Sequence, residues 1–385
     1  PPSVLAALEP LLPDVRKPAQ YLGGEHHQVV TPWAEAATRW LLCYPDAYEV
    51  GQPNQGIQIL YEVLNGRTTA LAERAYAPWL DLEELMRARG IPTFSLEQHL
   101  PLWAFDVFAV TLPHELGHTN LLNLIDLGGV PVRAADRTDE DPIVLVGGHA
   151  AFNPEPLAPF IDAAVMGDGE EVVLEIDDVL RDAKRRADDR ATLLRALADV
   201  EGVYIPSLYV DRRTPDGRLA RTVPTAPGLP AMVPKRTVQD LEQWPYPQRQ
   251  LVPMTETVHE RFSVEIFRGC TRGCRFCQAG MITRPVRERR PETVQRLVED
   301  GVASTGFEEV GLLSLSSADH SAIGPIAHDL ADRYDGTVTS LSLPSTRVDA
   351  FNVTLSNELA RNGRRSGLTF APEAGSERMR AVINK

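Results

Sequence analysis

Three of the four cysteines of the chain lie in one short segment, at Cys270, Cys274 and Cys277. Thiolates bind iron or zinc, and gaps of three and two residues let a single loop turn all three sulfurs toward a shared centre. Gly269 and Gly273 give this loop the backbone freedom that such a turn needs. Three thiolates leave one iron of a 4Fe-4S cube without a protein ligand, so the spacing predicts a cluster that binds a further molecule directly.

The surrounding sequence disfavours other uses of these thiols. A zinc site needs a fourth ligand at a familiar spacing, usually a second C-x2-C or a pair of histidines, and none follows Cys277. A disulfide would leave an odd thiol, and the opening residues Pro1–Leu5 lack the pattern of a secretory signal. We therefore expect reduced thiols, as in a cytoplasmic protein.

A second motif that could bind a metal is H-E-x-x-H, formed by His114, Glu115 and His118. Two imidazoles one helical turn apart can bind zinc while the glutamate acts as a base, so a zinc metallohydrolase is an alternative function. The setting argues against it, since Pro113 places the motif at a helix start and Leu121 stands where the extended protease pattern has glycine. The other interpretation is that both histidines line or cap a domain interface.

The chain has 385 residues and a formal net charge of −14. This length allows two domains. The acidic balance argues against a protein that coats nucleic acid nonspecifically, although a local basic surface can exist within an acidic whole. No apolar run approaches the length of a membrane span, so we expect a cytoplasmic protein without membrane contact.

Short apolar runs alternate with amphipathic stretches from Thr38 onward, which predicts parallel strands covered by helices. The expected strands are 40–44, 105–112, 143–146 and 163–166, and the expected helices are 57–64, 80–89 and a stretch ending at Leu127. This α/β pattern predicts a flavodoxin-like or Rossmann-like doubly wound domain with ligands at the carboxyl ends of its strands. The domain spans 38–186 and follows a leader, 1–37.

Residues 187–260 are expected to connect two domains through helical, hairpin and proline-rich segments. The hairpin spans 204–222 and turns at Pro215-Asp216-Gly217, and a stiff proline-rich stretch follows at 224–253. The alternation then restarts, with expected strands at 262–267, 310–315, 338–343 and 368–371. Residues 261–385 are therefore predicted to form the first four strands of a (β/α) barrel.

Polar residues follow the expected strands of this second domain, namely Ser314, Ser316, Ser317, Asp319, Arg347, Asp349 and Glu373. The carboxyl ends of parallel barrel strands face one mouth, so we expect these side chains to surround the cysteine loop. Each of them could instead be an ordinary cap or turn residue. The pair Pro372-Glu373 at a strand exit, before the turn at Gly375, favours a site over packing alone.

The cysteine loop, with Phe276 before its last cysteine and the expected strand 262–267 ahead of it, resembles the signature of the radical S-adenosylmethionine (radical SAM) superfamily. Further segments extend the likeness over nearly the whole chain, to a bacterial family in which a cobalamin-binding-like domain precedes the barrel: 21–25, 45–49, 75–79, 153–156, 167–170, 314–319 and 371–385. The resemblance implies that Cys270, Cys274 and Cys277 hold a 4Fe-4S cluster whose open iron binds S-adenosylmethionine. It also implies reductive cleavage to a 5'-deoxyadenosyl radical that abstracts hydrogen from a substrate, with electrons from a small donor such as flavodoxin or ferredoxin.

The resemblance also suggests how S-adenosylmethionine is held. Its expected contacts are Phe276, Ser314, Ser316, Ser317, Arg347 and Glu373. The oxygen atoms can accept from its amino and ribose groups, and the guanidinium can bind its carboxylate. Two features depart from the superfamily: serines occupy a place where many members have an acidic residue, and the barrel stops at Lys385 after its fourth strand, where six are usual. We therefore expect the chain to be part of a longer protein.

The segment Asp46–Gly51 has the spacing of the cobalamin motif D-x-H-x-x-G, with Tyr48 in place of the histidine that would bind cobalt. Gly147-Gly148 stands where the family places a glycine pair near the nucleotide tail of cobalamin. A phenol is a poor ligand at neutral pH, because its unperturbed pKa is about 10. A vestigial domain and a cobalamin site without an axial histidine both remain open, and the vestigial domain is the favoured interpretation.

Seven arginines lie around the cysteine loop, at Arg268, Arg272, Arg275, Arg284, Arg287, Arg289 and Arg290. Such density beside a catalytic mouth suits a phosphate-bearing or acidic substrate, RNA included. The alternative is that these arginines pair with carboxylates of this acidic chain. The sequence thus predicts a radical SAM enzyme, and the competing functions are the zinc metallohydrolase and a non-catalytic iron-sulfur binding module.

Overall fold

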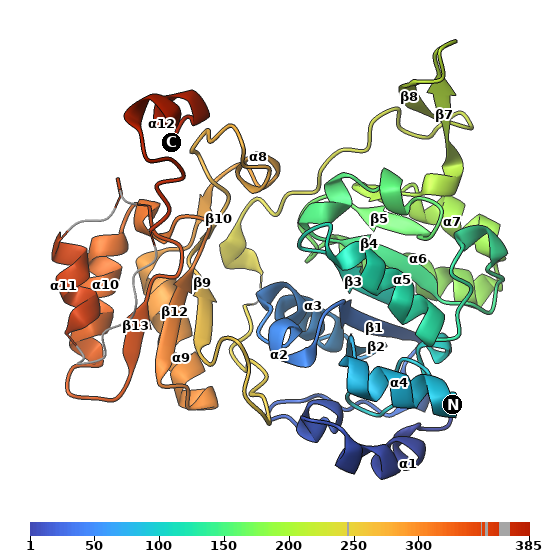
Figure 1. The fold of residues 1–385 in the computed structure, drawn as a ribbon, viewed down its shortest axis with the longest axis horizontal. Helices are drawn as coiled ribbons and strands as arrows, with labels where there is room; N and C mark the ends of the chain where they lie inside the picture. The colour runs from blue at the N-terminus through green and yellow to red at the C-terminus, as the bar shows by residue number, and fades with distance from the viewer. Residues whose placement is uncertain (245, 348, 351–352, 362–369) are drawn as a thin grey trace. The chain divides into compact units, whose positions relative to one another are not determined.

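The computed structural model describes residues 1–244, 246–347, 349–350, 353–361 and 370–385. The chain forms two compact units, whose elements are labelled in Figure 1. The N-terminal unit comprises Pro1–Val238 and Pro253–Val258, and the C-terminal unit comprises Gln239–Val252 and His259–Lys385. Among the described residues, no helix combines the length and the apolar character that a membrane crossing requires.

A six-stranded sheet forms the centre of the N-terminal unit, with strand order β2-β1-β3-β4-β5-β6. Its strands are β1 Thr38–Tyr44, β2 Ala70–Tyr76, β3 Val107–Thr111, β4 Ile143–Gly147, β5 Ala163–Val165 and β6 Val203–Tyr204. The first five run parallel, and β6 pairs antiparallel with β5. The order reverses between β1 and β3, which confirms the predicted doubly wound fold and places its ligand crevice at the carboxyl ends of these strands.

Helices connect the strands of this sheet (Figure 1). They are α1 Leu5–Leu8, α2 Tyr48–Gly51, α3 Gln55–Asn65, α4 Leu80–Arg89, α5 Gly117–Leu127, α6 Val172–Arg186 and α7 Arg190–Leu197. Leu121 and Leu124 of α5 share one buried core with Phe108 and Val144 of the sheet. The predicted hairpin is also confirmed, since β7 Tyr209–Arg213 pairs antiparallel with β8 Leu219–Pro224.

Strand β2 corrects the sequence-based assignment, which has no strand between the helices 57–64 and 80–89. The strand escapes the apolar pattern because Glu73 and Arg74 lie in its middle, where a buried strand normally carries apolar residues. Both side chains are fully buried. A buried charge is tolerated only when it is paired and hydrogen-bonded, so these residues need partners inside the unit.

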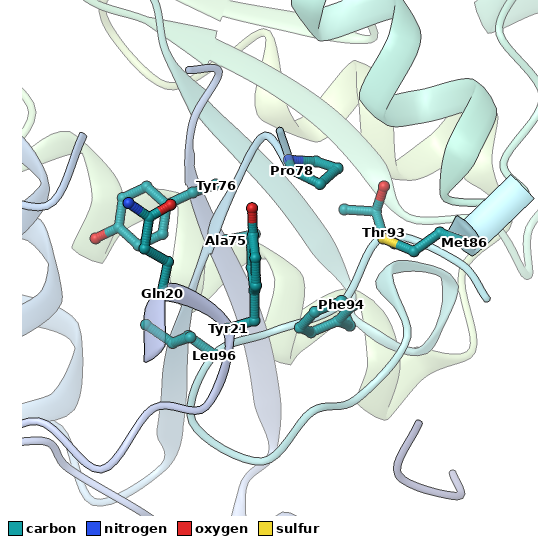
Figure 2. Close-up of a pocket in the computed structure, with 9 residues that line it drawn as sticks. All are labelled: Gln20, Tyr21, Ala75, Tyr76, Pro78, Met86, Thr93, Phe94 and Leu96. Atoms are coloured by element: carbon teal, nitrogen blue, oxygen red, sulfur yellow. The ribbon is translucent and has the colours of Figure 1, made fainter. Parts of the chain in front are cut away.

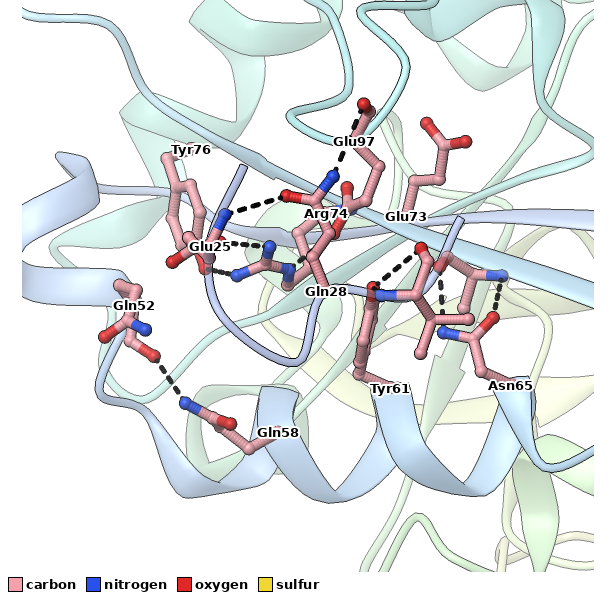
Figure 3. A network of polar contacts seen from close by, with 12 residues as sticks. Glu25, Gln28, Gln52, Gln58, Tyr61, Asn65, Glu73, Arg74, Tyr76 and Glu97 are labelled. Atoms are coloured by element: carbon pink, nitrogen blue, oxygen red, sulfur yellow. Dashed lines mark hydrogen bonds and ion pairs between the residues drawn. The ribbon is translucent and has the colours of Figure 1, made fainter. Parts of the chain in front are cut away.

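Arg74 finds those partners in a network of buried carboxylates (Figure 3). Its Nε lies 2.7 Å from Glu97 Oε1, and its Nη2 donates to Glu25. The backbone N–H of Arg74 donates to Glu97 Oε2 at 2.7 Å, and the Tyr48 hydroxyl donates to Glu25 Oε1 at 2.7 Å. Because Glu25 precedes β1 and β2 is an edge strand, the network fastens the N-terminal segment to the edge of the sheet.

The C-terminal unit contains a three-stranded parallel sheet with order β13-β12-β9. Its strands are β9 Phe262–Glu265, β12 Glu309–Leu313 and β13 Ser340–Ser342, and its helices are α8 Ala279–Ile282, α9 Pro291–Thr305, α10 Ile323–Arg333, α11 Val353–Ala360 and α12 Glu377–Ile383. The expected fourth strand begins outside the described residues, although Phe370 makes a parallel bridge to Thr346. The alternation of parallel strands and helices agrees with the predicted start of a (β/α) barrel.

A short antiparallel pair in the same unit frames the cysteine loop. It joins β10 Phe267–Arg268 to β11 Arg287–Glu288. The expected strand 262–267 is therefore divided, because Phe267 leaves the parallel sheet and pairs with Glu288. The three cysteines and α8 lie in the connection between β10 and β11.

We expect Arg74→Met to lower the free energy of unfolding by about 3–5 kcal/mol, because it leaves Glu25 and Glu97 as buried carboxylates without their cation. Urea denaturation followed by circular dichroism measures the loss. Arg87→Met is the matched control, since Arg87 also binds two carboxylates but its side chain is 42% exposed. It should cost less than about 1 kcal/mol. Equal losses in the two variants would contradict the importance of the buried network.

Candidate metal centre

The cysteine loop, residues 269–278, forms neither helix nor strand. Gly269 has a φ of 95°, and a Cβ there would lie 2.5 Å from the carbonyl oxygen of Pro285, so only glycine fits. Arg284 donates to the carbonyl oxygens of Cys270 and Arg272, at 3.2 Å from Nε and 3.0 Å from Nη2. The residues just before β11 therefore help to hold the loop in shape.

The three cysteines of the loop are free thiols, with Cys274 buried and the other two half-buried. The backbone N–H of Gly280 donates to Cys277 Sγ at 3.3 Å, and Arg347 Nη1 donates to Cys274 Sγ at 3.5 Å. Donors at sulfur stabilise the negative charge of a thiolate and tune iron-sulfur clusters. The donor set and its hydrogen bonds thus fit a cluster bound through three thiolates.

The loop as it stands is not a finished metal site. Within the part of the chain that the structure describes, no group of three or more His, Cys, Asp or Glu side chains is arranged to hold a metal ion. Metal sites often form together with the metal, because binding and folding are coupled. A loop without helix or strand hydrogen bonds can adjust in this way, and the role of the three cysteines stays a prediction.

Charged residues that follow β12 and β13 contact the cysteine loop. Arg272 donates through Nε to Asp319 Oδ2 at 2.9 Å and through Nη1 to Asp349 Oδ2 at 3.4 Å. Arg347 binds Asp349 through two hydrogen bonds, of 2.9 and 3.0 Å. These bonds from Arg347 lower the pKa of Asp349, so its carboxylate is charged at neutral pH. We call these four residues the arginine–aspartate network.

The three expected serines form a turn after β12. Ser317 is fully buried, and its hydroxyl donates to the carbonyl oxygen of Leu312 at 2.8 Å. The hydroxyl of Ser314 accepts from the N–H of Ser316 at 3.0 Å and lies 3.1 Å from the hydroxyl of Ser317. Ser314 and Ser317 therefore already use their hydroxyls within the turn.

Phe276 and Glu373 lie near one cation. Glu373, which has a φ of 65°, binds Lys385 Nζ at 2.7 Å, and this nitrogen is 5.9 Å from the centre of the Phe276 ring. Phe276 is 54% exposed, so its ring is accessible to a ligand. Contact of either residue with S-adenosylmethionine remains a prediction.

The seven arginines around the loop all donate to acceptors within the chain. Arg272 belongs to the arginine–aspartate network, and Arg284 holds the loop backbone. The other five pair with Glu265 (Arg268), the carbonyl of Val382 (Arg275), the carbonyl of Thr283 (Arg287), the carbonyls of Glu265 and Leu241 (Arg289), and Glu242 (Arg290). This pattern favours the intramolecular interpretation of the arginine cluster.

The H-E-x-x-H residues do not share a helix face. His114 and Glu115 are exposed and precede α5, which begins at Gly117, whereas His118 lies in its first turn. The expected position at a helix start is therefore confirmed. Two imidazoles chelate zinc from a helix only when both lie on it one turn apart, and His114 does not.

Tyr48, which stands in the place of the cobalamin histidine, is buried at the start of α2. Its hydroxyl donates to Glu25, as Figure 3 places among the polar contacts of that region. Burial, together with the charge of Glu25, raises the pKa of Tyr48 well above its ordinary value. A protonated phenol that is already used as a donor is unsuited to bind cobalt.

The glycine pair after β4 has two different surroundings. Gly148 has a φ of 92°, and a Cβ there would lie 2.6 Å from the carbonyl oxygen of Leu112, so packing of the chain itself explains this glycine. A Cβ at Gly147 would meet no atom within 4 Å, which leaves open space at the carboxyl end of β4. Only Gly147 therefore has room for the expected ligand.

A cavity at the carboxyl end of β2 lies between Tyr76, Pro78 and the N-terminal residues Gln20 and Tyr21 (Figure 2). Its volume is about 20 Å³. A single water needs roughly 10–15 Å³ by this measure. The cavity therefore has room for water and none for a corrin ring.

Two family models match the chain. The model described as radical SAM proteins, N-terminal, matches residues 56–206, and the radical SAM superfamily model matches residues 264–385. A curated relative, "Uncharacterized protein MJ0966" of Methanocaldococcus jannaschii, is 28% identical over 302 residues, and the match covers 78% of this chain and 56% of the relative. The chain thus spans about half the length of that relative.

Solved structures with a similar fold include two radical S-adenosylmethionine proteins. TsrM of Kitasatospora setae, a methyltransferase solved with tryptophan and a S-adenosylmethionine analogue, is 16% identical with a TM-score of 0.50, and the match covers 85% of this chain and 58% of TsrM. OxsB, a cobalamin-dependent enzyme solved with aqua-cobalamin and S-adenosylmethionine, is 12% identical with a TM-score of 0.52, covering 90% of this chain and 45% of OxsB. At these identities the likeness shows the fold.

We expect His114→Ala and His118→Ala to leave the zinc content of the purified protein at background, because the two imidazoles do not share a helix. Plasma mass spectrometry measures the metal, and His26→Ala, at an exposed histidine elsewhere in the unit, is the control. Stoichiometric zinc in the unchanged protein that is lost in both motif variants, but kept in the control, would establish the zinc site instead.

Proposed function

Because the chain belongs to the radical SAM superfamily, we propose that Cys270, Cys274 and Cys277 hold a 4Fe-4S cluster and that the protein is a radical SAM enzyme. When bound, such a cluster supplies the electron that cleaves S-adenosylmethionine to methionine and a 5'-deoxyadenosyl radical, which abstracts hydrogen from the substrate. A small donor such as flavodoxin or ferredoxin delivers the electron, and the reducing cytoplasm is the compartment that suits the thiols.

One observation carries this proposal. Three free thiols lie on a loop with few regular hydrogen bonds, and two of their sulfurs already receive N–H donors, from Gly280 and Arg347. Charged residues that follow β12 and β13 reach the same loop through Arg272. The arrangement supports a cluster with one iron open to a ligand, rather than a purely structural metal.

The protein's own residues position the cofactors. Arg284 and Gly269 hold the loop backbone, and the arginine–aspartate network fixes the loop to the strand ends. Ser316, Phe276 and Glu373 are our candidates for contacts with S-adenosylmethionine. Ser314 and Ser317 act by shaping the turn between them.

A groove beside the loop supports an acidic ligand. Its volume is about 450 Å³, and Arg272, Arg347, Arg380 and Lys385 contribute four cationic side chains to its lining. Acceptors within the chain neutralise part of this charge, yet a guanidinium has five N–H donors and can serve two partners. We propose that the groove receives a carboxylate or phosphate group, and an RNA or other acidic substrate belongs to this proposal.

Cobalamin is a second ligand that the fold suggests, since OxsB shares it and is solved with aqua-cobalamin. The surroundings of Tyr48 support the interpretation favoured by the sequence, a domain that keeps the fold without an axial ligand. Gly147 is the residue of the motif that still has open space beside it.

Anaerobic reconstitution tests the cluster. We expect about four irons per chain and broad absorption in the blue, as thiolate-bound clusters give. Replacement of Cys270, Cys274 or Cys277 by Ala should abolish the absorption, because each removes one of only three thiolate ligands. Cys43→Ala is the matched control, since Cys43 is a fully buried thiol in β1 that behaves as a small apolar side chain. A full cluster in Cys274→Ala would disprove the ligand assignment.

The same preparations separate the enzyme from a non-catalytic iron-sulfur module. Reconstituted protein with dithionite and S-adenosylmethionine should form 5'-deoxyadenosine and methionine, measured by mass spectrometry. The Cys277→Ala protein is the blank. A complete cluster without 5'-deoxyadenosine would favour the binding module.

Titration with cobalamin tests the N-terminal unit. We expect equilibrium dialysis to detect no tight binding to the unchanged protein, because Tyr48 is buried and bonded to Glu25. Tyr48→His should not create binding either, since the new imidazole would face the same buried carboxylate. Tight binding with a nitrogen ligand from the protein on cobalt, seen by electron paramagnetic resonance, would contradict this expectation.

A further inference from the structure

The guanidinium of Arg347 contacts one sulfur of the cysteine loop and no other thiol in the contacts of the described residues. Its Nη1 lies 3.5 Å from Cys274 Sγ, and Cys274 is the most buried of the three cysteines, at 8% exposed. The side chain of Arg347 is itself only 14% exposed. A donor beside a buried sulfur is poorly screened by water, so it acts strongly on the charge of that sulfur.

Asp349 fixes the direction of this donor. It accepts from Nε and Nη2 of Arg347 at 2.9 and 3.0 Å, which uses one edge of the guanidinium and leaves Nη1 to face the sulfur. Asp349 also offsets part of the positive charge that Cys274 experiences. Arg272 contacts the same carboxylate at 3.4 Å, and Asp319 binds Arg272 in turn. The charges of Arg347 and Asp349 therefore act on the sulfur with opposite signs.

We propose that Arg347 is a positioning residue that raises the reduction potential of the cluster through Cys274, and that Asp349 moderates this effect. The inference rests on the proposed function. Reduction adds an electron to the cluster, so an N–H donor and a positive charge at a ligating sulfur stabilise the reduced state. A carboxylate behind the guanidinium weakens that stabilisation.

The assignment differs from the role that the sequence suggests for Arg347, a donor to the carboxylate of S-adenosylmethionine. Three of its five N–H groups are engaged by Asp349 and Cys274 in the absence of any ligand. A contact that exists before the ligand arrives can tune the cluster in the resting protein. The effect is therefore measurable without S-adenosylmethionine.

The test is the midpoint potential of the reconstituted full chain, from a redox titration monitored by electron paramagnetic resonance without S-adenosylmethionine. Arg347→Met removes the donor and should lower the potential, by a tenfold or larger change in the reduction equilibrium, which is about 59 mV for a one-electron couple. Asp349→Asn removes the opposing charge and should raise the potential. Shifts of opposite sign separate this role from a general loosening of the loop, which would move both variants alike.

Arg380→Met is the matched control, because Arg380 lines the same groove but donates to the carbonyl oxygen of Ala374 at 2.8 Å. Its potential should equal that of the unchanged protein. An unchanged potential in Arg347→Met with a full cluster would overturn the inference and leave the proposed function intact. If Arg347→Met binds no cluster, a potential in Asp349→Asn that is unchanged or lowered overturns it. An unchanged protein that binds no cluster would instead overturn the proposed function itself.

Discussion

Guanidinium groups from outside the cysteine loop hold it in shape. The loop has no helix or strand to order its backbone, so Arg284 binds two of its carbonyl oxygens and Arg272 ties it to Asp319 and Asp349. A planar guanidinium suits this task, because its donors point in fixed directions and can bind two acceptors at once. The arginines that seem suited to a polyanion in the sequence are thus largely part of the architecture of the loop.

The N-terminal unit uses a buried guanidinium for a related purpose. Arg74 joins Glu25, which precedes the sheet, to Glu97, which follows α4, and so fastens both segments to the edge strand β2. Covering an edge strand removes a surface on which other chains could pair. The arrangement has a cost, since burial raises the pKa of the adjacent Glu73 to about 7, with the charge of Glu97 contributing.

Local pattern and distant contact divide what the sequence could predict. Helix α4 was predicted at its observed residues, 80–89, and β1, β3 and β4 to within a few residues, because apolar periodicity reflects burial of a regular element. Strand β2 was missed, because Arg74 is explained only by carboxylates 23 and 49 residues away. The cysteine spacing identified the loop, whereas the contact of Arg347 with Cys274, 73 residues apart, depends on how the strand ends converge.

The partners of a side chain decide whether a motif can act. Tyr48 keeps the spacing of a cobalamin motif, yet its hydroxyl is bound to Glu25 and its ring lies in the interior, so the motif has become part of the packing of the unit. Cys270, Cys274 and Cys277 differ, since their thiols are free and the groups around two of them are donors that favour a charged sulfur. The same test therefore directs the search for chemistry to the cysteine loop and away from the motif at Tyr48.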